Sequence, residues 1–527
     1  MSNNTLIDLT ILIVYIVGIT IYGLRKAKLV QNSKDFMVAG RSIGLFVLVG
    51  TLVMTELNTA TIIGLSIFPY KAGVYGTLIT FAYILSFGSY LLFVAKRWSR
   101  SNFVSITQLF DSRYSKKLRF MASILVIFAL LLFSTAYLKS AALVFSVVLN
   151  INLIYTAIII SIVVLLFTSR GGLISVAHTN KISFLMALVI VPLVFIFARQ
   201  KADVLGGLST VFEPKYLSWN IIGMWKDSTL PFEFIFTIWM ITFLMYMQSP
   251  WYAQYMFASK NEKTAFWGVA IAAILIFVLY WAFLMIAAYA RVGFPHLADP
   301  QTSIPNVISN WLPLGVKGIT MALIFSICQS TMATIWSNTS TTITKDVYNG
   351  YINKNASDKK ILFVSRIVIL FIAVMSIVSA IYFVDVIYQV MYCANIFIVA
   401  LLFPVLGGFL WWKVNGTAAW ATIILAVFCG WSIFFAQKYG NNLLPVFFQK
   451  ETHDWLFIYC CVITPAIILI GIIISIFVKD NDDGRKKKIK FYDKIGAPWF
   501  GKKEYLKAKS IQMKASGADS DESVTIA

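Results

Sequence analysis

The sequence Thr55-Glu56-Leu57-Asn58-Thr59 interrupts a long apolar segment that runs from Ser42 to Phe68. A carboxylate near the centre of a bilayer is costly and usually has a functional role. A second apolar segment, 230–258, is interrupted in the same way by Gln248-Ser249-Pro250-Trp251. Two interrupted membrane helices at corresponding positions are typical of secondary transporters, where the breaks form the substrate and ion site.

The composition of the whole chain supports a membrane location. Of the 527 residues, 59% are hydrophobic and only 13% are charged, which excludes a soluble globular protein. Apolar runs of about 20 residues, the length that crosses the hydrocarbon core, recur along the chain. The pattern predicts an all-α polytopic membrane protein with about 13 transmembrane helices. The spans are expected at 6–24, 42–68, 74–95, 119–149, 152–168, 182–198, 230–258, 264–291, 305–344, 361–384, 387–412, 416–437 and 454–478.

Lysine and arginine are concentrated in alternate connections, at 25–41, 96–119, 260–263 and 345–360. Because cytoplasmic loops carry an excess of these residues, we expect an outside N-terminus and a cytoplasmic C-terminus. The expected location is the plasma membrane, as a multi-pass protein of the bacterial inner membrane. The net charge of +21 follows from this topology and from attraction to anionic lipid, so no nucleic-acid partner is expected.

The two interrupted segments divide the chain into halves. Residues 42–198 and 230–412 each hold five expected spans, and an odd number inverts the second half in the membrane, giving a five-plus-five inverted repeat. The transporter core then covers 31–412, preceded by a peripheral first helix in 1–30 and followed by peripheral helices in 413–478. The basic tail, 479–527, is expected to be cytoplasmic and mostly disordered.

The first break also predicts a cation site. Unwinding a membrane helix frees backbone carbonyls that can bind a hard cation, and those of Met54 and Leu57 are well placed. The span 305–344 is rich in hydroxyl side chains, with the adjacent pair Ser330-Thr331 about midway along it. These hydroxyls can act as ion ligands or can instead bond to carbonyls of their own helix.

Three motifs add a specific signal. The first is 33–42 (SKDFMVAGRS) followed by Ile62-Ile63-Gly64, the second is 171–180 (GGLISVAHTN), and the third is 337–341 (SNTST) ending in Lys345-Asp346-Val347-Tyr348. In this order and spacing, over about 33–412, they resemble the solute:sodium symporter family, which includes proline, pantothenate, glucose and choline transporters. The resemblance implies sodium-coupled uptake by alternating access on a leucine-transporter-like fold, with Na+ as coupling ion, no other cofactor and no enzymatic activity.

The resemblance also implies roles for individual residues. It places a sodium site on the carbonyls of Met54, Leu57 and Ile327 and on the hydroxyls of Ser330 and Thr331, with Asn58 beside it. Glu56 matches the position at which proline-transporting members carry an aspartate needed for coupling. Many members have an aspartate where this chain has Asn180, and the neutral amide argues against a second cation route or a transported proton there.

Substrate contacts are expected around the two breaks, from Glu56, Asn58, Thr61, Gln248, Trp251 and the intramembrane Lys139. The lysine can extend to the outer interface, or it can face the cavity and pair with Glu56 or with a substrate carboxylate. An amino acid or small carboxylate is the expected solute. A local likeness to the choline-transporting branch, in Pro250-Trp251, 298–300 and 355–359, keeps a choline-like amine as an alternative.

Other functions compete with this prediction. In a proton-coupled carrier Glu56 would be the protonation site, and a channel or a non-transporting membrane sensor could use the same pocket. His178, His296 and His453 are far apart, and no phosphate-binding glycine loop is present, which argues against an enzyme or a nucleotide-driven pump. The expected partners are Na+, a small organic solute and membrane lipid, with a monomer expected and a dimer as the alternative.

Overall fold

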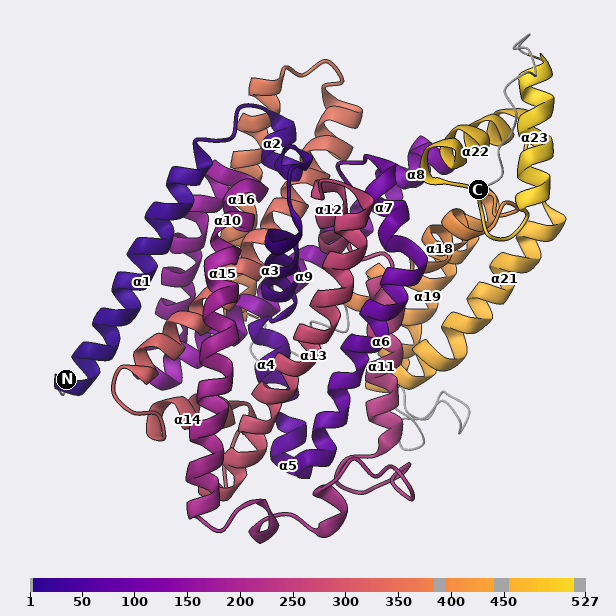
Figure 1. Cartoon of the computed structure of the whole chain (residues 1–527). Helices are drawn as coiled ribbons and strands as arrows, with labels where there is room; N and C mark the ends of the chain where they lie inside the picture. The colour runs from indigo at the N-terminus through magenta and orange to yellow at the C-terminus, as the bar shows by residue number, and fades with distance from the viewer. Residues whose placement is uncertain (1–2, 383–393, 440–454, 516–527) are drawn as a thin grey trace.

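The computed structural model describes residues 3–382, 394–439 and 455–515, and these residues form a bundle of helices (Figure 1). Within them, nine helices are long and apolar enough to cross a membrane, or eleven if each of two bent pairs counts as one span. Two shorter apolar helices, Leu153–Leu166 and Ala394–Leu410, add to these. The all-α class is confirmed, whereas the count of thirteen stays a prediction. Part of the expected span 387–412 lies outside the described residues.

The helices follow one another along the chain in three groups. The first group is α1 (Asn3–Ala27), α2 (Ser33–Val38), α3 (Leu45–Glu56), α4 (Thr59–Leu65), α5 (Ile67–Gly76), α6 (Phe81–Tyr90), α7 (Lys96–Ser101), α8 (Gln108–Arg113), α9 (Lys116–Leu149) and α10 (Leu153–Val204). The second is α11 (Phe232–Tyr246), α12 (Pro250–Ala258), α13 (Glu262–Gly293), α14 (Ser303–Asn310), α15 (Val316–Thr341), the π-helix η7 (Thr342–Ile352), α16 (Asp358–Tyr382) and α18 (Leu402–Leu410). The last is α19 (Gly416–Tyr439), α21 (Thr464–Phe477), α22 (Asp482–Ile495) and α23 (Lys502–Ala515).

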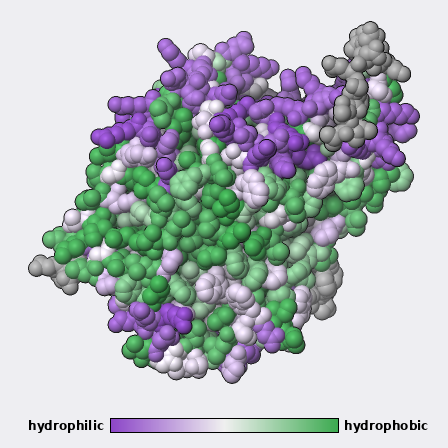
Figure 2. Space-filling model, viewed as in Figure 1, coloured by the Kyte–Doolittle hydropathy of each residue, from purple (hydrophilic) through white to green (hydrophobic). Residues whose placement is uncertain are grey.

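The surface agrees with a membrane location. Figure 2 shows a broad apolar belt between two hydrophilic ends. The larger hydrophilic end carries α2, α8, α22 and α23, and the opposite end carries α5 and the loop after α10 (Figures 1 and 2). We call these the basic face and the α5 face.

The first break separates α3 from α4, with a bend of 46°. Leu57 leaves the helical region (φ −63°, ψ 81°), and Asn58 begins the next helix. The Asn58 side chain accepts a 2.7 Å hydrogen bond from the amide of Thr61 and donates a 2.9 Å bond to the carbonyl of Glu56. A single asparagine therefore satisfies backbone groups on both sides of the break.

The second break separates α11 from α12, with a bend of 44°. Ser249 is extended (ψ 124°) and Pro250 occupies the first turn of α12. Proline disfavours the helical conformation of the preceding residue, and at the start of a helix its missing N–H costs nothing. The similar bends support the inverted repeat, which stays a prediction.

The two spans expected at 152–168 and 182–198 form one long helix, α10, with a kink at Gly172. The φ of Gly172 is +48°, and a Cβ there would lie 2.4 Å from the carbonyl oxygen of Phe36. Only glycine combines this backbone conformation with so close an approach.

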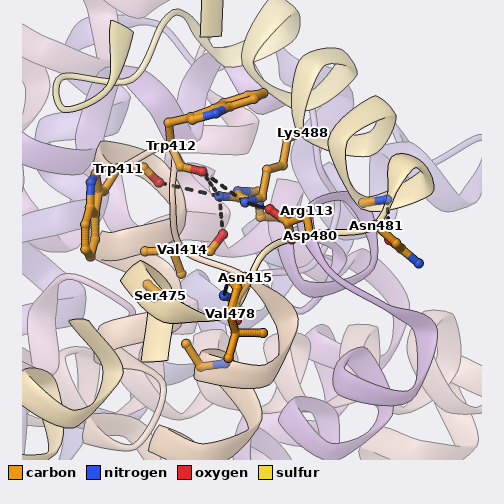
Figure 3. Close-up of polar contacts among 12 residues, drawn as sticks. Arg113, Trp411, Trp412, Val414, Asn415, Ser475, Val478, Asp480, Asn481 and Lys488 are labelled. Atoms are coloured by element: carbon orange, nitrogen blue, oxygen red, sulfur yellow. Dashed lines mark hydrogen bonds and ion pairs between the residues drawn. The ribbon is translucent and has the colours of Figure 1, made fainter. Parts of the chain in front are cut away.

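The expectation of a mostly disordered tail is wrong for 482–515, where α22 and α23 form; residues 516–527 lie outside the described part. The α22 helix buries Lys488, Phe491, Tyr492 and Ile495, a stripe at helical spacing within a strongly charged sequence. Near the point where the tail packs, Arg113 of α8 donates a 2.8 Å hydrogen bond to the carbonyl of Val414, and Lys488 pairs with Asp480 (Figure 3). The tail is thus packed onto the basic face.

Candidate functional site

The two breaks meet at a cavity of about 80 Å³ inside the bundle. Polar groups of the first break reach it from Thr55, Glu56, Asn58 and Thr61. Its aromatic wall consists of Tyr83, Phe133, Tyr137, Tyr246, Trp251 and Tyr252. The site is therefore a partly open, largely aromatic chamber beside a broken helix, as small-molecule sites commonly are.

Glu56 is buried, with 4% of its surface exposed. One of its carboxylate oxygens accepts a 2.5 Å hydrogen bond from the hydroxyl of Tyr246, at the end of α11. Its backbone carbonyl accepts hydrogen bonds from Tyr280 of α13 and from Asn58. The Glu56 carboxylate is consequently bonded to the helix before the second break, and the Glu56 carbonyl is bonded to α13 and to Asn58.

Thr55 points to different elements from those that Glu56 contacts. Its hydroxyl lies 2.8 Å from the hydroxyl of Tyr255 on α12 and 3.4 Å from that of Thr334 on α15. Tyr255 and Thr334 are also bonded to each other, at 2.5 Å. These three hydroxyls join α3, α12 and α15 on the side of the breaks that faces the basic face.

The residues of the predicted sodium site lie on α3 and α15, which are in contact. The amide of Asn58 donates to the Tyr280 hydroxyl, and the amide of Thr61 to the Asn58 side chain. In an uninterrupted helix these two amides would bond to the carbonyls of Met54 and Leu57. Both carbonyls are thus released from the helical pattern.

The hydroxyls of α15 complete the candidate ion site. Thr331 Oγ1 donates either to the carbonyl of Thr55, at 3.3 Å, or to that of Ile327, at 3.1 Å. Ser330 Oγ is buried and has no hydrogen-bond partner among the described residues. Released carbonyls and an unpartnered hydroxyl are donors of the kind that Na+ binds at unwound transporter helices.

The remaining predicted residues fall into two groups. Thr61 and Trp251 line the cavity with Asn58, whereas Gln248 and Lys139 are not among its described lining residues. The Gln248 amide donates to the carbonyl of Leu244, and its Oε1 has no partner in the described ranges. Lys139 is half-buried on α9. A substrate role for either residue stays a prediction.

Several wall residues were missed from the sequence, foremost Tyr246 and Tyr137. Tyr246 is the last residue of α11 before the second break, and Glu56 is the last residue of α3 before the first break. Pairing the residues that flank the two breaks would have suggested the contact. Tyr137 and Phe133, spaced by one helical turn on α9, gave no such signal because apolar and aromatic residues fill that segment.

The cavity extends toward the α5 face. Its wall on that side comes from α4, through Gly64 and Leu65, and from α11, through Ile238 and Thr242. In Figure 1, α4 and α11 lie in the lower half of the bundle and α12 in the upper half. The Thr55-Tyr255-Thr334 contact closes the opposite side, so the site is asymmetric between the two ends of the bundle.

Comparisons with known proteins agree with this arrangement. The sequence model of the "Sodium:solute symporter family" matches residues 36–426. The chain is 24% identical to a sodium/glucose cotransporter of Vibrio parahaemolyticus, over 68% of this chain and 72% of that protein. It is 22% identical to a sodium/pantothenate symporter of Haemophilus influenzae, over 81% of this chain and 90% of that protein.

A third relative, a high-affinity proline transporter of Bacillus subtilis, is 23% identical over 67% of this chain and 76% of its own length. Among solved structures, a substrate-bound, outward-open Na+-coupled sialic acid symporter superposes with a TM-score of 0.73 at 17% identity, covering 90% of this chain and 99% of that one. A nucleobase-cation-symport-1 family transporter in a closed conformation superposes with a TM-score of 0.53 at 12% identity, covering 86% of this chain and 98% of that one. The leucine-transporter-like fold is thereby confirmed.

Proposed function

This chain belongs to the sodium:solute symporter family, whose members are transporters coupled to Na+ and not enzymes, and on that premise we propose that it imports a small organic solute bound in the cavity beside Glu56. An amino acid or a small carboxylate is the proposed class of solute. The observation that carries the proposal is the 2.5 Å contact between Glu56 and Tyr246, which joins the two broken helix pairs at one site.

The proposed sodium position lies between α3 and α15. The released carbonyls of Met54 and Leu57, the carbonyl of Ile327 and the hydroxyls of Ser330 and Thr331 would bind the ion there. The unpartnered Ser330 hydroxyl supports this position, because a buried polar atom without a hydrogen bond costs free energy that a ligand can offset. Bound Na+ would hold the first break in one geometry and so order the neighbouring solute cavity.

The proposed cycle alternates access between the two ends of the bundle. The cavity reaches toward the α5 face, which we assign to the cell exterior, together with the N-terminus. Separation of the Thr55-Tyr255-Thr334 hydroxyls would open the basic face, which we assign to the cytoplasm. The membrane potential then contributes about 2.3 kcal/mol per translocated charge per 100 mV.

The test is uptake by proteoliposomes that contain the purified protein, with a defined mixture of amino acids, carboxylates, amines and sugars outside. An inward Na+ gradient should concentrate at least one compound inside above its outside concentration. An equal K+ gradient should not. Equal accumulation under both gradients, or none under either, would contradict the proposal.

A proton-coupled carrier is the second candidate, and the buried Glu56 carboxyl is the observation that favours it. Tyr246 is a hydroxyl donor to that carboxyl, and the described lining residues include no basic side chain that would keep it ionised. This candidate requires uptake that follows an imposed pH gradient in sodium-free buffer. Uptake that depends on Na+ and is indifferent to the pH gradient excludes it.

A further inference from the structure

The charge of the solute cavity is unbalanced in the described part of the chain. Among the described lining residues Glu56 is the only charged side chain, and the rest of the wall is aromatic, aliphatic, hydroxyl or amide. A buried carboxylate that has only hydroxyl or amide neighbours is strongly destabilised unless a cation or a proton accompanies it. None of the described lining residues supplies a positive charge, so a bound cation or a proton has to accompany this carboxylate.

The proposed sodium ligands on α15 and the carboxylate of Glu56 contact different elements at the first break. The ion ligands on α15 meet the first break through Thr55, whose carbonyl accepts from Thr331 and whose hydroxyl contacts Thr334. The carboxylate of the next residue, Glu56, is bonded to Tyr246 on α11 instead. The two adjacent side chains thus have different hydrogen-bond partners, although Thr55 and Thr331 line the same cavity as Glu56.

The rings around the carboxylate complete a cation-binding environment. Phe133 and Trp251 meet edge to face with centroids 5.3 Å apart, and Tyr246 and Tyr252 lie 4.9 Å apart. Aromatic faces attract ammonium groups, most strongly where water is excluded. One carboxylate and several ring faces together suit a protonated nitrogen on an apolar body.

The size of the cavity limits the solute. Its volume of about 80 Å³ is smaller than the ~150 Å³ of an engineered cavity that binds benzene. Solutes of the size of leucine or choline therefore require the wall side chains to move on binding, which favours small solutes over large ones.

From these observations we infer that the solute is a small compound with a protonated or quaternary nitrogen, which Glu56 neutralises between the aromatic rings. The inference rests on the proposed function, and it replaces small carboxylates without an amino group by nitrogen-bearing compounds as the class of solute. Zwitterionic amino acids and simple amines fit, because each brings a positive charge to the carboxylate. Carboxylates without an amino group do not fit, because their charge would face that of Glu56.

The experiment uses nitrogen-bearing compounds, partners in which only the nitrogen is exchanged, and amines that lack the carboxylate. One set is L-leucine, 2-hydroxy-4-methylpentanoate and 3-methylbutylamine; a second is L-proline, cyclopentanecarboxylate and pyrrolidine; a third is choline and its neutral isostere 3,3-dimethylbutanol. Glucose and pantothenate are added, all are supplied at equal concentration to proteoliposomes under an inward Na+ gradient, and the lumen is measured by mass spectrometry.

We expect at least one nitrogen-bearing member to accumulate tenfold or more above its nitrogen-free partner. Accumulation of a hydroxy acid, carboxylate, alcohol or sugar in preference to its nitrogen-bearing partner would overturn the inference and leave sodium-coupled import standing. Failure of every compound to accumulate under the gradient would count against both.

Glu56→Gln is the matched variant, since it keeps size and hydrogen bonding and removes the charge. It should lose at least tenfold in accumulation of the nitrogen-bearing compound while keeping the thermal stabilisation by Na+ that the wild type shows. Glu56→Asp, which keeps the charge, should retain part of the uptake. Wild-type uptake in Glu56→Gln, or loss of its sodium stabilisation, would contradict the assignment of this carboxylate to the solute.

Discussion

The hydroxyl of Tyr246 donates a 2.5 Å hydrogen bond to the carboxylate of Glu56. One residue ends α11 before the second break, and the other ends α3 before the first, so this contact joins the two interrupted helices directly. Alternating access requires such helices to move relative to each other. Under the proposed function, this bond would link the occupancy of the solute cavity to the relative position of the two helices.

Tyr246→Phe tests that link. Removing the hydroxyl deprives Glu56 of a hydrogen bond, and bonds to charged groups contribute about 1.5–3 kcal/mol. We expect the KM for the transported solute to rise about tenfold or more in sodium-driven uptake. Tyr90→Phe is the control, because the Tyr90 hydroxyl is buried, has no partner among the described residues and does not line the cavity. An equal rise in KM in the two variants would show that the contact between Tyr246 and Glu56 has no specific role in solute binding.

Asn58→Ala should weaken the first break. The variant loses the cap of α4 and the bond to the Glu56 carbonyl, which together should lower the free energy of unfolding by about 1–2 kcal/mol. Because the Thr61 amide is then free to bond to the Leu57 carbonyl, the Na+ concentration for half-maximal uptake should also rise several-fold.

The matched control is Asn261→Ala, which removes an equivalent cap at the start of α13, where the side chain accepts from the amide of Thr264 at 2.8 Å. It should lower the thermal stability to a similar degree and leave sodium activation unchanged. A sodium effect of the same size in both variants would mean that stability alone sets the sodium response.

The sequence predicted the positions of both breaks because a carboxylate or a proline inside an apolar segment is conspicuous. It also placed a cation site on the carbonyls of Met54 and Leu57, which stays a prediction. Tyr246 and Phe133 could not be predicted, because an aromatic residue in a membrane helix looks the same whether it faces lipid or a cavity. Only the packing of α9 against α4 and the contact of Tyr246 with Glu56 distinguish the two cases.

The tail was misread for a related reason. Its high charge is typical of disorder, and the buried positions Phe491, Tyr492 and Ile495 are few. The sequence offered no sign of the surface that receives them, which α7 and α8 supply. Local composition decides disorder only when no such partner surface is present.

Asp346→Asn should be strongly destabilising. The Asp346 side chain is fully buried, lies 2.6 Å from Arg119 and accepts from Ser105 at 2.9 Å, so it fastens η7 to α9 and the preceding loop. Breaking a buried pair typically costs about 3–5 kcal/mol. Thermal unfolding in detergent measures the loss.

Asp111→Asn is the control for that variant, because Asp111 pairs with the same arginine at 3.4 Å but is 26% exposed. Its expected cost is below about 1 kcal/mol, as for other partly exposed pairs. If the two variants unfolded at the same temperature, the buried contacts of Asp346 would contribute little.

The docking of α22 should depend on pH. Burial lowers the pKa of Lys488 to about 7, and the guanidinium of Arg113 adds to this, so the ion pair with Asp480 only partly offsets the loss of hydration. A released lysine has a pKa of about 10.4. Between these two values the released tail binds more protons than the docked tail, so docking strengthens as pH rises from about 7 toward 10.

Limited proteolysis of the tail measures this effect. The tail should be cut more slowly at pH 9 than at pH 7, after correction for the activity of the protease. Lys488→Met should abolish the difference and keep the tail docked, whereas Asp480→Asn should accelerate cutting at pH 7, because Lys488 then loses its carboxylate. An unchanged pH dependence in Lys488→Met would assign the effect to another group.

The central claim is that Na+ binds between the first break and α15, and sodium-specific thermal stabilisation tests it most directly. The melting temperature of the purified protein is measured in NaCl and in KCl at constant ionic strength, for the wild type, Ser330→Ala, Thr331→Ala and the control Thr320→Ala, whose hydroxyl bonds to a carbonyl of its own helix. We predict stabilisation by Na+ in the wild type and the control, and at least a tenfold higher Na+ requirement in the other two. Equal sodium stabilisation in all four proteins would contradict the site.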